Sequence, residues 1–96
     1  MVANIFQRGE TIICWRNVKN VDTGAYEDPT TSMKITINNF QNGIEVDNQA
    51  MTPNGVGKYH YDFNSTLINP KGNYTVFYTA TDGARITIFK DSFKLE

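Results

Sequence analysis

The chain has one cysteine, one histidine, three prolines and a formal net charge of −1 over 96 residues. The single thiol, Cys14, excludes an internal disulfide, so packing alone must hold the fold together, as is usual in reducing compartments. The small net charge disfavours binding to nucleic acid or anionic membrane, because both need clustered Lys and Arg. No apolar run approaches the roughly 20 residues of a membrane span, and no signal peptide is recognisable. We expect cytoplasmic synthesis, with a virion as a candidate destination.

Motifs for catalysis and for metal binding are equally scarce. Cys14 and His60 would have to meet beside an oxyanion hole to act as a nucleophilic pair, and no suitable glycine motif accompanies either residue. Zinc needs more His or Cys ligands than this chain has. The three acids of the segment 20–31 do not follow the spacing of a calcium loop. The sequence therefore predicts a non-catalytic protein without cofactor or metal.

The chain is rich in short runs that alternate between apolar and polar residues, which are typical of half-buried β-strands. The clearest run is 72–83, GNYTVFYTATDG, where Tyr74, Val76, Tyr78 and Ala80 share one face. It predicts the central strand of an antiparallel sheet, closed by an Asp-Gly hairpin turn.

Similar runs predict seven to eight short strands, and hence a single all-β domain over 1–96 that folds as an antiparallel sandwich. The other expected strands are 1–7, 11–18, 32–38, 44–51, 57–63 and 85–95. An Asn42-Gly43 turn should join 32–38 to 44–51. We expect 44–51 to be a short edge strand that pairs with 57–63.

The segment 11–18 is ambiguous, because Ile12, Cys14 and Val18 share one face while Ile13 and Trp15 share the other. A strand that is apolar on both faces usually lies inside a sheet. We therefore expect Trp15 to be a core or sheet-covering aromatic, with an exposed stacking platform as the alternative.

Two further expectations concern the C-terminal third of the chain. Leu67 and Ile68 should form an apolar plug in the crossover that precedes the central strand. In 85–95 the apolar residues change phase around Lys90-Asp91, which suggests a β-bulge there.

Several of these motifs occur in a recognisable order. They are GETI at 9–12, DxG at 22–24, DPT at 28–30, the alternating run 33–37, GxYxYxF at 57–63 and GxYxVxxxATDG at 72–83. The set resembles macroglobulin-like and bacterial immunoglobulin-like sandwich domains. The Pro-x-Gly-x-Tyr entry that ends at Tyr74 is similar to their tyrosine corner, in which the hydroxyl bonds nearby backbone. The resemblance implies an immunoglobulin-like β-sandwich of the kind found in bacteriophage structural proteins and bacterial surface proteins.

The expected function is a structural or protein-interaction module, with an accessory head, tail or decoration protein of a phage particle as the first choice. The alternatives are a carbohydrate-binding module with exposed aromatics and a spacer domain of a surface assembly. The candidate interaction surface comprises Ile5, Phe6, Trp15, Tyr59, Tyr61, Ile86 and Ile88. Edge strands leave N–H and C=O groups unpaired, so we expect 1–7 or 85–95 to pair with another protein chain, including a second copy.

Overall fold

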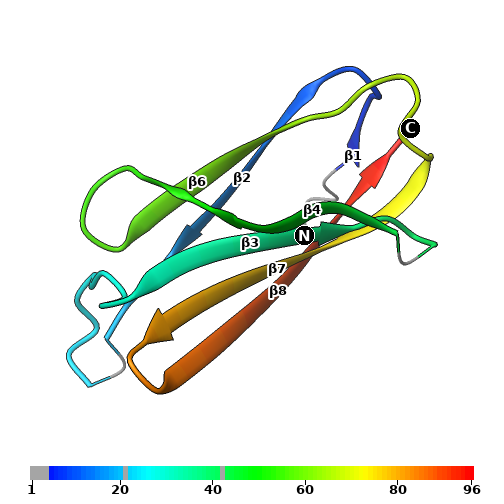
Figure 1. The fold of residues 1–96 in the computed structure, drawn as a ribbon. Coiled ribbons are helices and arrows are strands. Elements are labelled where there is room, and N and C mark those ends of the chain that lie inside the picture. Colours follow the sequence, from blue (N-terminus) through cyan, green and yellow to red (C-terminus); the bar gives the residue numbers. More distant parts are fainter. Residues whose placement is uncertain (1–4, 21, 42) are drawn as a thin grey trace.

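The computed structural model describes residues 5–20, 22–41 and 43–96, which form two β-sheets and contain no helix (Figure 1). The five-stranded sheet has the order β1 (Ile5–Phe6), β8 (Arg85–Leu95), β7 (Gly72–Asp82), β3 (Ser32–Asn38) and β4 (Ile44–Ala50). The three-stranded sheet has the order β2 (Thr11–Asn17), β6 (Lys58–Asn64) and β5 (Thr52–Pro53). The all-β class without a disulfide is confirmed.

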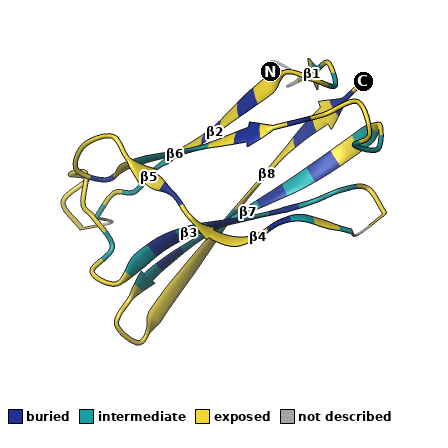
Figure 2. Cartoon of the chain, turned by 45° about the horizontal axis from the view of Figure 1, so that its top comes forward, coloured by how far each residue is buried: buried dark blue, intermediate teal, exposed yellow. Residues whose placement is uncertain are grey.

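The hydrophobic core lies between the two sheets and is organised by β7, the central strand of the larger sheet. The four alternate residues from Tyr74 to Ala80 share one face, as their spacing predicted, and all four are buried (Figure 2). The neighbouring β3 contributes its own buried alternation. The smaller sheet contributes Ile12, Cys14 and Phe63. Side chains of both sheets therefore form one core, as in a β-sandwich.

The tyrosine at the start of β7 makes the hydrogen bond that its motif predicted. The Tyr74 hydroxyl donates to the Pro70 carbonyl oxygen at 2.7 Å. Its ring is fully buried and stacks on Phe93, with 5.0 Å between the ring centroids and 12° between the planes. The bond therefore holds the entry to β7 against the core.

The chain changes sheets after β4, and the expected pairing of 44–51 with 57–63 is wrong. β4 pairs with β3 and lies at the sheet edge as predicted, whereas the two-residue β5 pairs with β6. The change occurs at buried Met51, whose N–H donates to the Met33 carbonyl oxygen. The predicted Asn42-Gly43 turn includes Asn42, which lies outside the described residues.

The last strand is regular, so the bulge expected at Lys90-Asp91 is wrong. The β7–β8 register continues without interruption from Gly72 opposite Leu95 to Asp82 opposite Arg85. The apolar residues change phase because β8 is apolar on different faces along its length: Ile86 and Ile88 face outward, while later apolar residues face the core. The irregular register lies instead between β3 and β4.

The first and last strands do not form two separate sheet edges, because β1 pairs with β8. This pairing is parallel, with Ile5 opposite Lys94 and Phe6 opposite Leu95, and departs from the expected all-antiparallel arrangement. Of the expected strand 1–7, residues 1–4 lie outside the described residues. β2 lies at an edge of its sheet and not inside it.

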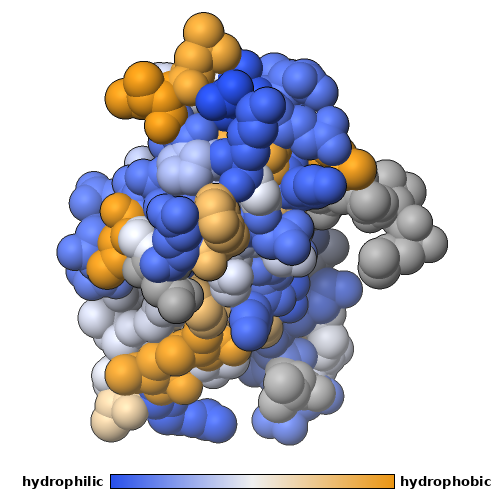
Figure 3. Space-filling model, turned by 90° about the vertical axis from the view of Figure 1, so that its right-hand side faces the viewer, coloured by the Kyte–Doolittle hydropathy of each residue, from blue (hydrophilic) through white to orange (hydrophobic). Residues whose placement is uncertain are grey.

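The crossover between β6 and β7 is held by polar contacts, so the expected plug of Leu67 and Ile68 is wrong. Both side chains are exposed, Ile68 to 91%. The buried residue is Ser65, whose hydroxyl donates to the Glu10 carbonyl oxygen at 2.6 Å. Figure 3 views this end of the molecule and shows hydrophobic residues protruding from a mostly hydrophilic surface.

Candidate functional site: an open flank and an aromatic face

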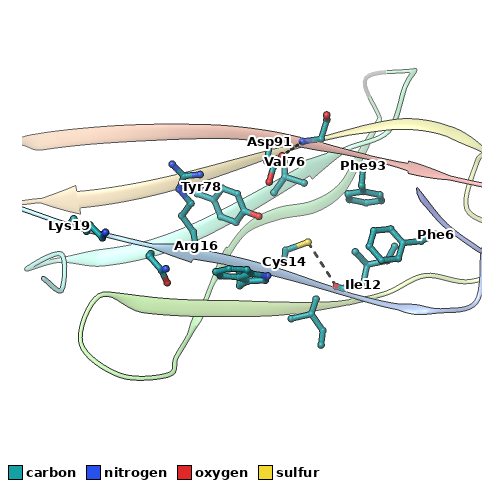
Figure 4. A pocket seen from close by; sticks show the side chains of 13 residues that line it. Phe6, Ile12, Cys14, Arg16, Lys19, Val76, Tyr78, Asp91 and Phe93 are labelled. Carbon is teal, nitrogen blue, oxygen red and sulfur yellow. Dashed lines mark hydrogen bonds between the residues drawn. The ribbon is translucent and has the colours of Figure 1, made fainter. Parts of the chain in front are cut away.

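The two sheets leave a groove along the flank between β2 and β8, here called the flank groove. Its volume is about 580 Å³. The labelled residues of Figure 4 show its composition: apolar side chains of both sheets, with Arg16 between the sheets beside Tyr78 and two further charged residues, Lys19 and Asp91. The side chains of the two sheets include Ile12, Cys14, Val76, Tyr78 and Phe93.

One end of the flank groove is occupied by the chain itself. Phe6 of β1 packs edge-on against Phe93, with 6.0 Å between ring centroids and 83° between the planes. Ile5, the preceding residue, is exposed. A strand laid against β8 can therefore place an alternate side chain in this groove.

The groove contains the only thiol of the chain, and this thiol is buried. Burial, with a smaller contribution from the negative charges of Asp91 and Asp62, raises the pKa of Cys14 to about 12. The hydroxyl of Tyr78 points toward this thiol, and burial raises its pKa as well (Figure 4). Cys14 is therefore protonated at neutral pH and a poor nucleophile.

Cys14 and His60 do not form the nucleophilic pair considered from the sequence. Cys14 lies on the core face of the three-stranded sheet, whereas His60 lies opposite Trp15 on the outer face. Because neighbouring residues of a strand point to opposite faces, the sheet itself separates the thiol from the imidazole. Among the described residues, no group of three or more His, Cys, Asp or Glu side chains could hold a metal ion.

The outer edge of β8 carries backbone groups that β7 does not use. The Glu96 N–H donates to the Phe6 carbonyl oxygen at 2.8 Å, and the Glu96 carbonyl accepts from Arg8 N–H at 2.9 Å. The backbone N–H and C=O of Glu96 therefore point away from β7. Because the register is regular, the N–H and C=O groups of every second residue before Glu96 also point away from β7. These residues are Lys94, Ser92, Lys90, Ile88 and Ile86.

The second surface is the outer face of the three-stranded sheet, here called the Trp15 face. Trp15 is 64% exposed, so the expectation of a core or sheet-covering tryptophan is wrong. The physical reason is that β2 is apolar on both faces but only its inner face meets the other sheet. A hollow of about 520 Å³ lies here. It is lined by Ile13, Trp15, Asn17, Tyr26, Asn54, Lys58, Tyr59, His60 and Asp62.

The seven residues of the predicted interaction surface do not form one patch. Tyr59 and Tyr61 are partly buried and pack against the core, and Tyr59 also lines the hollow of the Trp15 face. The other five are divided between the β1 end of β8, the Trp15 face and the outer face of the five-stranded sheet. Ile86 and Ile88 lie on the last of these and are 64% and 62% exposed.

Contacts around Gly57, here called the Gly57 junction, join the start of β6 to the loop between β2 and β3 and border one side of the Trp15 face. They were not predicted from the sequence. Asp28 accepts hydrogen bonds from Gly57 N–H at 2.7 Å and from the Tyr59 hydroxyl at 3.0 Å. Tyr26, from the same loop, lies with its ring centroid 5.0 Å from Lys19 Nζ and 5.0 Å from Lys58 Nζ. The glycine of the GxYxYxF motif was the available signal.

Comparison with known proteins gives no match to a family model, to a curated protein or to a solved structure. The described residues include no helix long and apolar enough to cross a membrane.

Proposed function

We propose that this protein is a non-catalytic structural and protein-interaction module with an immunoglobulin-like fold, which serves as an accessory component of a phage particle. It attaches to other protein chains by adding a strand to the outer edge of β8. The observation that carries the proposal is this edge, which runs beside the flank groove and whose outward backbone groups from Ile86 to Ser92 have no partner strand among the described residues.

The topology supports the immunoglobulin-like part of the proposal. The order β2-β6-β5 corresponds to strands B, E and D of such domains, and β8-β7-β3 corresponds to G, F and C. β4 adds a further strand beside C, as in variable-type domains. The Tyr74 bond to Pro70 occupies the place of the tyrosine corner at the start of strand F. The phage context itself comes from the resemblance of the sequence motifs.

The intramolecular pairing of β1 supports the proposed mode of attachment. In the described part of the chain, β1 pairs with Lys94 and Leu95 alone, and it inserts Phe6 into the end of the flank groove. A partner strand farther along β8 can combine the same two elements, backbone pairing with side chains in a groove, which is the usual basis of strand addition. Charged residues such as Lys90 give the free edge only partial protection against such pairing.

The test is a proline on the free edge. Lys90→Pro removes one outward N–H of β8 without removing a bond to β7, and Lys90→Ala is the matched control that keeps the N–H. We expect the proline variant to lose assembly, measured by sedimentation and by copurification with virions on a density gradient, while the alanine variant keeps it. Circular dichroism and a cooperative thermal transition would show that both variants are folded.

Two results would overturn the proposal. One is a folded Lys90→Pro protein that assembles like the wild type. The other is a wild-type protein that stays monomeric at every concentration and copurifies with no particle.

A second candidate function is carbohydrate binding at the Trp15 face. The exposed indole offers a flat apolar surface for the C–H face of a sugar ring, and Asn17, His60 and Asp62 supply hydrogen-bonding groups for hydroxyls around the same hollow. A volume of about 520 Å³ is in the usual range of small-molecule sites, roughly 300–1,000 Å³.

A further inference from the structure

The outer edge of β8 can form backbone hydrogen bonds with the same edge of a second copy of the chain. Among the described residues, β1 pairs with β8 no farther than Lys94, and the outward N–H and C=O groups of Ile86, Ile88 and Lys90 face no strand of residues 5–96. An antiparallel pair of identical strands around a twofold axis satisfies the same groups on both copies, which makes the contact closed and self-complementary.

Only certain registers allow the two copies of β8 to pair. A residue whose N–H and C=O groups point outward must lie opposite a residue of the second copy whose groups also point outward. With the axis at Ile88, Ile88 lies opposite Ile88 of the second copy, and Ile86 lies opposite Lys90. On the core-side face of the strand, Arg85 then lies opposite Asp91 of the second copy. Opposite charges placed directly across a strand pair are favourable.

The neighbouring registers lack this complementarity. With the axis at Phe89, Asp91 faces Thr87 and Ile88 faces Lys90. With the axis at Lys90, the two copies of Lys90 face each other, and like charges directly opposite destabilise a strand pair.

We propose that two copies of this chain associate through antiparallel β8–β8 pairing centred on Ile88, so that the two five-stranded sheets form one continuous sheet. Within the described part of the chain, neither Arg85 nor Asp91 takes part in an ion pair. Asp91 Oδ1 accepts a hydrogen bond from Ser92 N–H at 2.8 Å, and its other carboxylate oxygen is available to the second copy. Ile88 is 62% exposed in the single chain, and in the proposed pair Ile88 of the second copy covers it. This inference rests on the proposed function, since it names the partner strand for the same edge.

Cysteine cross-linking tests the register. Residues that face each other as a hydrogen-bonded antiparallel pair have Cα atoms about 5.5 Å apart, within disulfide range. Ile88→Cys should therefore form a disulfide-linked dimer under mild oxidation, whereas Lys90→Cys, several residues from its copy in this register, should not. Native Cys14 can remain, because it is buried and its pKa is raised. A dimer with Lys90→Cys, or none with Ile88→Cys, overturns the register.

Charge exchange tests the same pairing in solution. Arg85→Asp and Asp91→Arg should each raise the dimer dissociation constant about tenfold or more, measured by sedimentation equilibrium, and the double variant should return to within about threefold of the wild type. A double variant as weak as either single one overturns the pairing. If Lys90→Pro abolishes particle binding but neither cross-linking nor charge exchange has an effect, the proposed function stands and self-pairing falls.

Discussion

Gly57→Ala should destabilise the protein far more than an alanine at another left-handed glycine. Gly57 has φ of +68°, and a Cβ there would lie 2.5 Å from the Val18 carbonyl oxygen and 2.7 Å from the Glu27 backbone nitrogen. Backbone atoms cannot move aside as the end of a flexible side chain can. Gly24 is the matched control, because its φ is +72° and no atom lies within 4 Å of its Cβ position.

The magnitude follows from the contacts at the junction. The left-handed conformation costs a non-glycine residue about 1–2 kcal/mol, and both variants bear this cost. At Gly57 the chain must also shift, which disturbs the bonds from Val18 N–H to the Gly57 carbonyl and from Glu27 N–H to the Val18 carbonyl. At about 0.5–1.5 kcal/mol each, their loss adds roughly 1–3 kcal/mol.

Urea denaturation of the two variants measures the difference in unfolding free energy. We expect Gly57→Ala to be less stable than Gly24→Ala by about 2 kcal/mol, a large share of the roughly 5–14 kcal/mol available to a domain of this size. Equal losses in the two variants, within about 0.5 kcal/mol, would refute the close-contact reasoning.

Two further predictions concern Tyr74 and Trp15. Tyr74→Phe leaves the Pro70 carbonyl without its donor and should cost about 1–3 kcal/mol in urea denaturation, while Tyr26→Phe, at an exposed position, should change stability little; equal losses would contradict the corner's structural role. If the Trp15 face binds sugars, titration with soluble β-glucan, xylan or dextran should change the fluorescence of Trp15, the only tryptophan. In gels that contain the same polysaccharide, migration of the wild-type protein and of the Ile86→Ala control should be retarded, whereas Trp15→Ala should abolish the retardation. A flat titration with all three would exclude the candidate function for these glycans.

The features that could be predicted from the sequence depend on contacts between near neighbours in the chain. The alternation in β7 predicted a central strand and showed which residues share a face, because a strand's side chains alternate with a period of two. The Tyr74 bond reaches a residue only four positions earlier. Such features need no knowledge of where distant segments lie.

The wrong predictions all depended on which segments meet. Alternation in 44–51 shows a strand but does not name its partner, and the change of sheet at Met51 is visible only in the fold. The residues of β2 are apolar on both faces, so their pattern did not show whether the face with Trp15 is buried. Only the arrangement of the two sheets shows that this face is exposed. The role of Gly57 depends on Val18 and Glu27, which are distant in sequence.

The two candidate binding surfaces adjoin each other at β2, because Ile13 and Trp15 line both the flank groove and the hollow of the Trp15 face. A strand added to β8 extends the five-stranded sheet and leaves the outer face of β2 uncovered, whereas a strand added to the edge of β2 would lie beside Trp15. Assembly through β8 therefore predicts that Lys90→Pro abolishes assembly and leaves sugar binding at the Trp15 face unchanged. If a folded Lys90→Pro protein still assembles and Trp15→Ala weakens assembly, the partner strand lies along β2, and the assignment of the attachment edge to β8 is wrong.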